Sequence, residues 1–341
     1  MKALLLNKIC NLNENSSPLQ LKDIPVPVPS ENELLIKVHT CGVCHTELDE
    51  IEGRTPPPVF PIVPGHQVVG KIIKKGNKTH KFKIGDRVGV GWKYSSCGKC
   101  SYCLEGNDNL CAEFRATGRD VNGGYAEYMV VPEVTAFLIP DIFSDSEAAP
   151  LLCAGAIGYR SVKLALISNN QNIGLTGFGA SAHLVLKMVK HKFPGTKIFV
   201  FARSEKEREF ALQLGAEWAG NTTDLSPEKL NDIIDTTPVW TPVVEALRNL
   251  KPGGRLVINA IRKEDIDKDY LMKINYPKHL WMEKEIKSVA NVSASDIEQF
   301  LKIASEIPIR PEYQEYKLED ANLAISELKQ QYIRCAKVLI I

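Results

Sequence analysis

NIGLTGFGASA, the stretch at residues 172–182, joins an apolar run to a glycine-rich turn and then to the first turn of a helical pattern. The helical spacing of apolar residues continues from Ser181 to Lys190. A strand that ends in glycines and leads into a helix begins a βαβ unit, in which the next strand runs parallel to the first. This stretch therefore predicts a parallel sheet covered by helices.

The segments that follow continue the alternation of strand and helix. The predicted elements are strands at 197–201, 233–235 and 254–258 and helices at 205–214 and 243–250. Strict alternation of this kind indicates a doubly wound parallel sheet, which is the Rossmann architecture. We place this domain at residues 151–290.

Residues 1–150 have a different pattern. Runs rich in β-forming residues, such as 34–38 and 68–73, alternate with prolines and glycines that predict turns. The tail at 291–341 holds strand-like and helix-like pieces that we expect to complete this first domain. The predicted fold class is therefore α/β, with a β-rich domain and a Rossmann domain.

Composition excludes several classes of function. The chain has 341 residues, of which 44% are hydrophobic, and 42 basic residues balance 41 acidic ones. Such a balance argues against a nucleic-acid partner. The sequence contains no apolar run of membrane-spanning length, and its first residues do not form a signal peptide. We expect a cytoplasmic protein, in which the nine cysteines are more suited to metal binding than to disulfides.

Four of these cysteines form one short motif. Cys97, Cys100, Cys103 and Cys111 have the spacing C-x2-C-x2-C-x7-C. Four thiolates this close in sequence can surround one zinc ion tetrahedrally, and such a site is structural because no coordination position remains open. An iron–sulfur cluster uses similar spacing and stays open as the alternative.

Three other motifs hold isolated ligand-type side chains. They are CGVCHT at 41–46, GHQ at 65–67 and PLLCAG at 150–155. A single cysteine is more often a small buried apolar residue than a ligand. None of these motifs predicts a metal site by itself.

Together, and in this order along the chain, the motifs resemble those of the zinc-containing medium-chain alcohol dehydrogenases. GDRV at 85–88 and GGYAEY at 123–128 extend the resemblance over nearly the whole chain. It implies a GroES-like catalytic domain beside the Rossmann domain. It also implies hydride transfer between a nicotinamide cofactor and a primary alcohol or aldehyde.

The resemblance implies roles for several residues. Cys44, His66 and Cys153 correspond to the ligands of a catalytic zinc, which makes two zinc ions per chain with the four-cysteine site. Thr46 corresponds to the hydroxyl that takes the substrate proton, and His45 to a contact of the cofactor pyrophosphate.

The sequence departs from the family pattern at three places near these ligands. Gln67 stands where relatives usually have glutamate, and Glu47 where many have aspartate. Asp49 stands where many relatives end the proton relay with histidine, so we expect a carboxylate to end it here.

The glycine-rich turn is a candidate cofactor site in two registers. One contains Gly174, Gly177 and Gly179, and the other runs from Gly177 to Ala182 as G-x-G-x-x-A. In either register, backbone N–H groups at the start of a helix would face the pyrophosphate.

The end of the next strand bears on cofactor preference. Ala202, Arg203 and Ser204 lie where an NAD enzyme normally has a carboxylate for the ribose hydroxyls. Arginine suits a 2′-phosphate, so we predict NADP(H) over NAD(H). Near the C-terminus, the Gly-Arg motif that often meets the cofactor in relatives is missing, and Cys335-Ala336-Lys337 stands there instead; we assign its role to neither Arg334 nor Lys337.

Two other functions stay open. One is a zinc-free quinone or enoyl reductase of the same superfamily, and the other is a non-catalytic relative that only binds cofactor. The resemblance further favours a homo-oligomer, with a tetramer preferred over a dimer.

Overall fold

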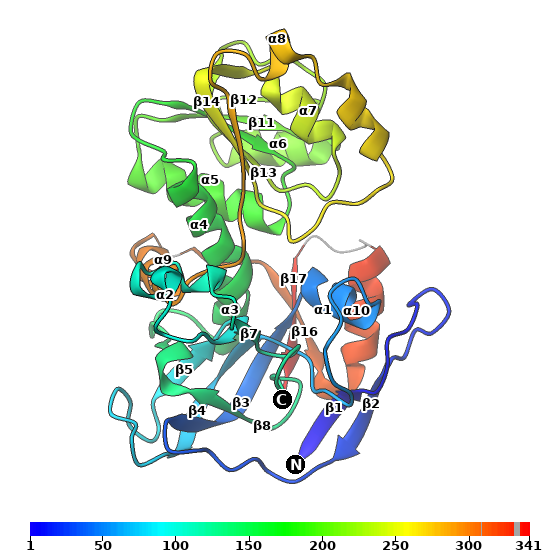
Figure 1. The fold of residues 1–341 in the computed structure, drawn as a ribbon, viewed down its shortest axis with the longest axis vertical. Coiled ribbons are helices and arrows are strands. Elements are labelled where there is room, and N and C mark those ends of the chain that lie inside the picture. Colours follow the sequence, from blue (N-terminus) through cyan, green and yellow to red (C-terminus); the bar gives the residue numbers. More distant parts are fainter. Residues whose placement is uncertain (308, 331–334) are drawn as a thin grey trace. The chain divides into compact units, whose positions relative to one another are not determined.

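A computed structural model describes residues 1–307, 309–330 and 335–341. The chain divides into two compact units (Figure 1). Unit 1 comprises Met1–Cys153 and Val292–Ile341, and unit 2 comprises Ala154–Asn291. Within the described ranges, no helix is long and apolar enough to span a bilayer.

Unit 2 is built on a six-stranded sheet whose order is β12-β11-β10-β13-β14-β15 and whose neighbouring strands all run parallel. Its strands are β10 (Asn172–Thr176), β11 (Lys197–Phe201), β12 (Trp218–Gly220), β13 (Leu230–Asp235), β14 (Leu250–Ile258) and β15 (Glu285–Ser288). The strands lie side by side with helices around them (Figure 1). This confirms the predicted parallel sheet and the α/β fold class.

The helices of unit 2 follow its strands in the predicted alternation. They are α4 (Ala156–Leu164), α5 (Ala180–Lys192), α6 (Glu205–Gln213), α7 (Thr241–Leu247) and α8 (Tyr276–His279), with a 3₁₀ segment at Lys268–Lys273. The predicted helix at 243–250 was wrong at its end, because Leu250 is already the first residue of β14 and pairs with Leu230. An apolar run that passes directly from helix to strand gives no local signal for the boundary.

The strand order places a topological switch point between β10 and β13. From β10 the chain adds β11 and β12 on one side, and from β13 it adds β14 and β15 on the other. In open α/β sheets, ligands bind in the crevice outside the carboxyl ends of the strands at the switch point, which here are β10 and β13.

Unit 1 contains a seven-stranded mixed sheet. Its order is β16-β17-β3-β4-β5-β9, with β8 paired to β3. The strands of unit 1 are β1 (Lys2–Leu6), β2 (Leu19–Asp23), β3 (Glu33–Val43), β4 (Gln67–Lys75), β5 (Arg87–Val90), β6 (Lys93–Ser95), β7 (Arg115–Ala116), β8 (Tyr128–Pro132), β9 (Ala136–Leu138), β16 (Tyr313–Lys317) and β17 (Ala336–Ile340). The C-terminal tail thus joins the first part of the chain in one sheet.

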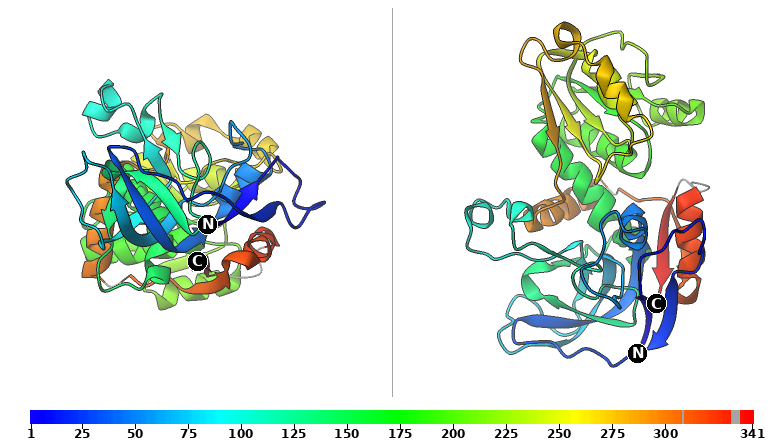
Figure 2. Two further views of the ribbon diagram at one scale, coloured as in Figure 1. Left: turned by 90° about the horizontal axis from the view of Figure 1, so that it is seen from below. Right: turned by 45° about the vertical axis from the view of Figure 1, so that its right-hand side comes forward.

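The helices of unit 1 are short except for two near the C-terminus. They are α1 (His45–Ile51), α2 (Ser101–Leu104), α3 (Asp145–Pro150), α9 (Ala294–Glu306) and α10 (Ala321–Gln330), with 3₁₀ turns at Asp108–Leu110, Glu133–Thr135 and Leu318–Asp320. The core collects apolar side chains from β1, β3, β4, β8 and α10, so residues far apart in sequence share it. Both chain ends lie close together in this unit (Figures 1 and 2).

One carboxyl group is buried at the amino-terminal side of the sheet in unit 2. Asp232 of β13 is 8% exposed, and burial raises its pKa to about 6 even though Arg255 lies nearby and opposes the shift. A folded-state pKa above that of the unfolded chain means that the native state holds its proton more tightly. Native stability therefore falls as the pH rises from about 4 through 6.

We expect Asp232→Asn to remove this pH-dependent loss. Relative to the wild type, the variant should gain on the order of 2 kcal/mol of unfolding free energy between pH 4.5 and pH 8. Urea unfolding at both pH values measures the difference, with the exposed Asp269→Asn as control. An equal difference at the two pH values would contradict the assignment.

Candidate active site and metal centres

The first candidate centre begins where β3 ends and α1 starts. Cys44 is the N-cap of α1, and its Sγ accepts a hydrogen bond of 3.4 Å from the Thr46 N–H. The Cys44 N–H donates to Glu47 Oε2 at 2.8 Å, which completes a capping box. Such reciprocal bonds at a helix start hold the N-cap side chain in a defined direction.

His66, the residue before β4, is held against the same carboxylate. Its side chain is 1% exposed, and Nδ1 lies 2.6 Å from Glu47 Oε1. Its Nε2 lies 3.6 Å from Cys44 Sγ. Glu47 thus binds the backbone at Cys44 and the imidazole of His66 at once, and leaves Nε2 as the nitrogen that faces the sulfur.

Cys153 completes the group from another part of unit 1. It lies in a π-helical turn, Leu151–Gly155, that follows α3. The ligand atoms of Cys44, His66 and Cys153 all lie within 4.8 Å of one another. π-Helical turns of this kind occur frequently at functional sites, since they redirect side chains out of the regular helical pattern.

The electrostatics of this group suit a cation. The hydrogen bond that the Cys44 thiol donates to Cys153 and burial both raise the pKa of Cys44 well above its usual range. For His66, burial works to lower the pKa, but the Glu47 carboxylate and Cys44 outweigh it and raise the pKa. Two thiolates beside a buried carboxylate repel one another, and a divalent cation in the position between the three ligand atoms would neutralise them.

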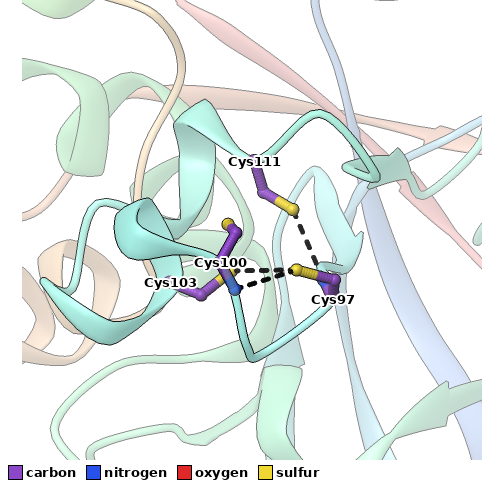
Figure 3. Close-up of side chains that lie close together, drawn as sticks. All are labelled: Cys97, Cys100, Cys103 and Cys111. Carbon is purple, nitrogen blue, oxygen red and sulfur yellow. Dashed lines mark hydrogen bonds between the residues drawn. The ribbon is translucent and has the colours of Figure 1, made fainter.

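The second candidate centre is the four-cysteine group of unit 1. Cys97, Cys100, Cys103 and Cys111 come together around α2 and the 3₁₀ turn Asp108–Leu110 (Figure 3). Their sulfur atoms all lie within 4.8 Å of one another, and Cys97 Sγ is 3.9 Å from Cys103 Sγ. Tetrahedral zinc with bonds of about 2.3 Å places thiolates about 3.8 Å apart, so the group fits zinc.

Backbone N–H groups support thiolates in this loop. The Cys100 N–H donates to Cys97 Sγ and the Cys97 N–H to Cys111 Sγ, both at 3.4 Å (Figure 3). Hydrogen bonds from the backbone at Lys99 and Cys100 lower the pKa of Cys97 to about 6. A thiol with this pKa is largely ionised at neutral pH, as a metal ligand must be.

The remaining predicted residues of the first centre lie on α1. His45 is exposed and Thr46 is buried. The Asp49 carboxylate is buried and lies 2.5 Å from Arg54 Nε, so it forms an ion pair beside the site. Gln67 packs over Gly42, where an added Cβ would lie 2.2 Å from the Gln67 side-chain oxygen.

Glu50 is a buried carboxyl group that the sequence motifs did not single out. It lies one turn after Glu47 on α1, and its Oε1 accepts a hydrogen bond of 3.3 Å from Trp92 Nε1. Burial and the nearby Glu47 raise the pKa of Glu50 to about 8. The spacing of three residues between Glu47 and Glu50 was the one sequence signal that could have found it, because such residues share a helix face.

In unit 2, the structure distinguishes the two registers of the glycine motif. Gly174 lies inside β10, packed so closely on Ile233 and Leu230 that an added Cβ would lie 2.8 Å from each, and it does not reach the turn. Gly177 forms the turn with φ of +73°, and Gly179 is the N-cap of α5. The register from Gly177 to Ala182 therefore matches the strand–turn–helix geometry of a phosphate-binding turn.

The end of β11 carries the other predicted cofactor residues. Ala202 is buried, Arg203 is exposed, and Ser204 is the N-cap of α6. Arg208 donates to the carbonyl oxygens of Ala202 at 2.9 Å and Arg203 at 3.0 Å, so it holds this segment in place.

Lys337 forms hydrogen bonds with two other side chains of unit 1. Its Nζ is buried and donates to the Tyr316 hydroxyl at 2.7 Å and to Glu327 Oε2 at 2.9 Å. These bonds tie β16 and β17 to α10. Arg334, the other basic residue considered at this place, lies outside the described residues.

Comparison with known proteins agrees with the motifs. The family model for the alcohol dehydrogenase GroES-like domain matches residues 30–141. A probable alcohol dehydrogenase, AdhA, of Mycobacterium tuberculosis is 40% identical over 332 residues, which cover 96% of this chain and 94% of that protein. An alcohol dehydrogenase of Geobacillus stearothermophilus is 30% identical over 341 residues, covering 97% of this chain and 98% of the relative.

The solved structures include a cinnamyl alcohol dehydrogenase from Sorghum bicolor. It has a TM-score of 0.82 and 26% sequence identity, and the match covers 99% of this chain and 97% of that one. Identity of 40% along almost the full chain, together with the fold and the two ligand groups, shows that the chain belongs to the zinc-containing medium-chain alcohol dehydrogenases.

Proposed function

We propose that the protein is a zinc-dependent alcohol dehydrogenase that exchanges a hydride between NADP(H) and a primary alcohol or aldehyde. The observation that carries this proposal is the approach of Cys44, His66 and Cys153 to within 4.8 Å, with Thr46 at the start of the same helix. The names of the relatives support alcohol dehydrogenase activity as such.

The three ligands would hold a catalytic zinc and leave its fourth position for substrate. A zinc ion held there would supply a Lewis acid for the oxygen of the alcohol or aldehyde, and a bound nicotinamide would supply the group that gives or accepts the hydride. Glu47 orients the His66 ring by its contact at Nδ1 and so presents Nε2 to the metal. The four-cysteine group would hold a second, structural zinc.

Proton transfer would begin at Thr46. Thr46 lies in the first turn of α1, two residues after the ligand Cys44. We assign its hydroxyl the role of accepting the proton of the alcohol substrate. Asp49, one turn further along the helix, would carry the proton onward, and its carboxylate lies 2.5 Å from Arg54 Nε. His45 is exposed, as a residue that contacts a cofactor phosphate needs to be.

The preference for NADP(H) rests on the end of β11. Ala202 offers no carboxylate to the ribose hydroxyls, and the exposed Arg203 and Lys206 supply positive charge beside it. Arg208 has its Nη1 committed to backbone carbonyls, so Arg203 is the arginine we assign to the 2′-phosphate. Gly177 and Gly179 would face the pyrophosphate from the turn before α5.

We expect the zinc-loaded enzyme to reduce aldehydes with a higher kcat/KM for the reaction with NADPH than with NADH. Arg203→Ala should raise the KM for NADPH about tenfold or more, because a charge-assisted hydrogen bond contributes about 1.5–3 kcal/mol. Steady-state kinetics over a series of aldehyde chain lengths measures both, and the KM for NADH is the internal control. Preference for NADH would overturn the cofactor assignment and leave the dehydrogenase in place.

We expect Glu47→Gln to weaken metal binding at the first centre by about 10–100-fold, because the amide no longer offers a carboxylate to His66. After dialysis against a chelator, metal analysis should find close to one zinc per chain in the variant and close to two in the wild type. Glu52→Gln, at the C-terminal end of α1, is the matched control. A wild type that holds one zinc and shows no turnover would favour the non-catalytic alternative.

For the assembly, we propose a homotetramer. Strand β15 ends the sheet of unit 2, and all four of its residues are exposed, as are Trp281 and Met282 just before it. An exposed strand edge flanked by apolar side chains favours pairing with a second copy.

The proposed tetramer consists of two such pairs, so light scattering should give four times the chain mass of 37.9 kDa. Ile286→Asp, at the exposed edge, should lower that mass, while Ile84→Asp, at a more exposed position in unit 1, should not. A wild type with the mass of one chain would contradict the proposal.

A further inference from the structure

A buried network of polar side chains lies at the carboxyl ends of β10 and β13. Asp235, the last residue of β13, is fully buried. Its Oδ1 accepts hydrogen bonds from the hydroxyls of Thr176 at 2.5 Å and Thr237 at 2.7 Å. Its Oδ2 accepts from Lys263 Nζ, a lysine whose side chain is also buried. Burying an ion pair costs desolvation free energy, which the hydrogen bonds around it must offset. The contacts of Asp235 and Lys263 therefore identify the segments that this pair joins.

The lysine joins two loops that follow different strands. Lys263 comes from the segment after β14, and its Nζ also donates to the carbonyl oxygens of Thr237 at 2.7 Å and Val239 at 2.9 Å. Together with Asp235 Oδ2, these two carbonyl oxygens make three acceptors, and all three belong to the end of β13 and the segment after it. One ammonium group therefore fastens the segment after β14 to the segment after β13.

The segment after β13 in turn supports the glycine turn. Thr236 donates to the Thr176 carbonyl oxygen from its N–H at 3.0 Å and from its hydroxyl at 2.9 Å. A Cβ added to Gly177 would lie 2.9 Å from Thr237 Cγ2 and 3.0 Å from Thr236 Oγ1. The backbone of the turn thus rests directly on Thr236 and on Thr237, and the ion pair holds Thr237.

A second contact reaches the first turn of α5. Asn259, directly after β14, donates from its N–H to the Asp235 carbonyl oxygen at 2.7 Å and from its side-chain amide to Ser181 Oγ at 3.3 Å. The segment that carries Lys263 therefore borders the crevice at the switch point, next to the helix start that faces the proposed pyrophosphate site.

We propose that Asp235 and Lys263 are positioning residues for the dinucleotide: by holding Thr176, Thr237 and Val239, they set the shape of the turn that binds the cofactor pyrophosphate. This inference rests on the proposed nicotinamide-dependent function. The network touches the turn from the β13 side, whereas Ala202 and Arg203 lie at the end of β11, on the other side of β10. Loss of the network should therefore weaken binding of the whole dinucleotide more than binding of its adenosine end.

The test measures dissociation constants of the zinc-loaded enzyme by calorimetry, with NADPH, NADH and 2′-AMP as probes. Lys263→Met should raise the dissociation constant of the preferred dinucleotide about tenfold, change that of 2′-AMP less than twofold and leave the zinc content at the wild-type value. Lys284→Met is the matched control, since this lysine also donates to two carbonyl oxygens, those of Leu247 and Lys278, but lies at the amino end of β15.

The double variant Asp235→Asn/Lys263→Met separates positioning from stability. It leaves no buried charge alone, so its unfolding temperature should recover relative to Lys263→Met. Its dinucleotide affinity should stay low, because the carbonyls of Thr237 and Val239 still lack their donor. Recovery of affinity together with stability would overturn the inference and assign the pair a purely structural role.

Two further outcomes distinguish failure of the positioning role from failure of the proposed function. Wild-type affinity in Lys263→Met would overturn the positioning role and leave the proposed function intact. A wild-type enzyme that binds neither NADPH nor NADH would overturn both.

Discussion

The contact between Glu47 and two segments of unit 1 is the constraint on which the first centre depends. One carboxylate accepts the N–H of Cys44 and faces Nδ1 of His66, so it joins the start of α1 to the residue before β4. The family pattern often has aspartate at this position, and the glutamate of this chain makes both contacts with a side chain that is one methylene longer. Because the side chain is completely buried, water does not compete for either contact.

The same region concentrates negative charge. Glu47 and Glu50 share one face of α1, and Cys44 and Cys153 add two sulfur ligands next to them. Burial and, after it, the nearby Glu47 carboxylate raise the pKa of Glu50 to about 8. Gln67 is neutral where relatives usually carry a carboxylate, and the buried Glu50 lies close enough to His66 to interact with it electrostatically.

In unit 2, a buried ion pair holds the segment that supports the glycine turn. The turn at Gly177 must keep its backbone N–H groups in place without side chains of its own. Neighbouring segments supply the rigidity: Thr236 and Thr237 support the turn, and the buried pair of Asp235 and Lys263 holds Thr237. In both units, therefore, a buried carboxylate organises two segments that are distant in sequence.

The sequence by itself determined the features that are local. The alternation around residues 172–258 gave the parallel sheet, because apolar periodicity reflects each element separately. The spacing of Cys97 to Cys111 brought four sulfur atoms together, since so short a loop keeps its ends close. The ordered motifs also sufficed for the family, which the relatives confirm.

Only the tertiary structure decided what depends on contacts between distant segments. Whether Gly174 or Gly177 forms the turn depended on where β10 ends against β13, and the glycine pattern fits both. Glu50, Asp235 and Lys263 carried no motif, because burial and ion pairing arise when strands and loops pack and leave no periodic trace in the sequence. The approach of Cys153 to Cys44 and His66 is of the same kind, since 87 residues separate His66 from Cys153 and only the packing of unit 1 brings them within reach.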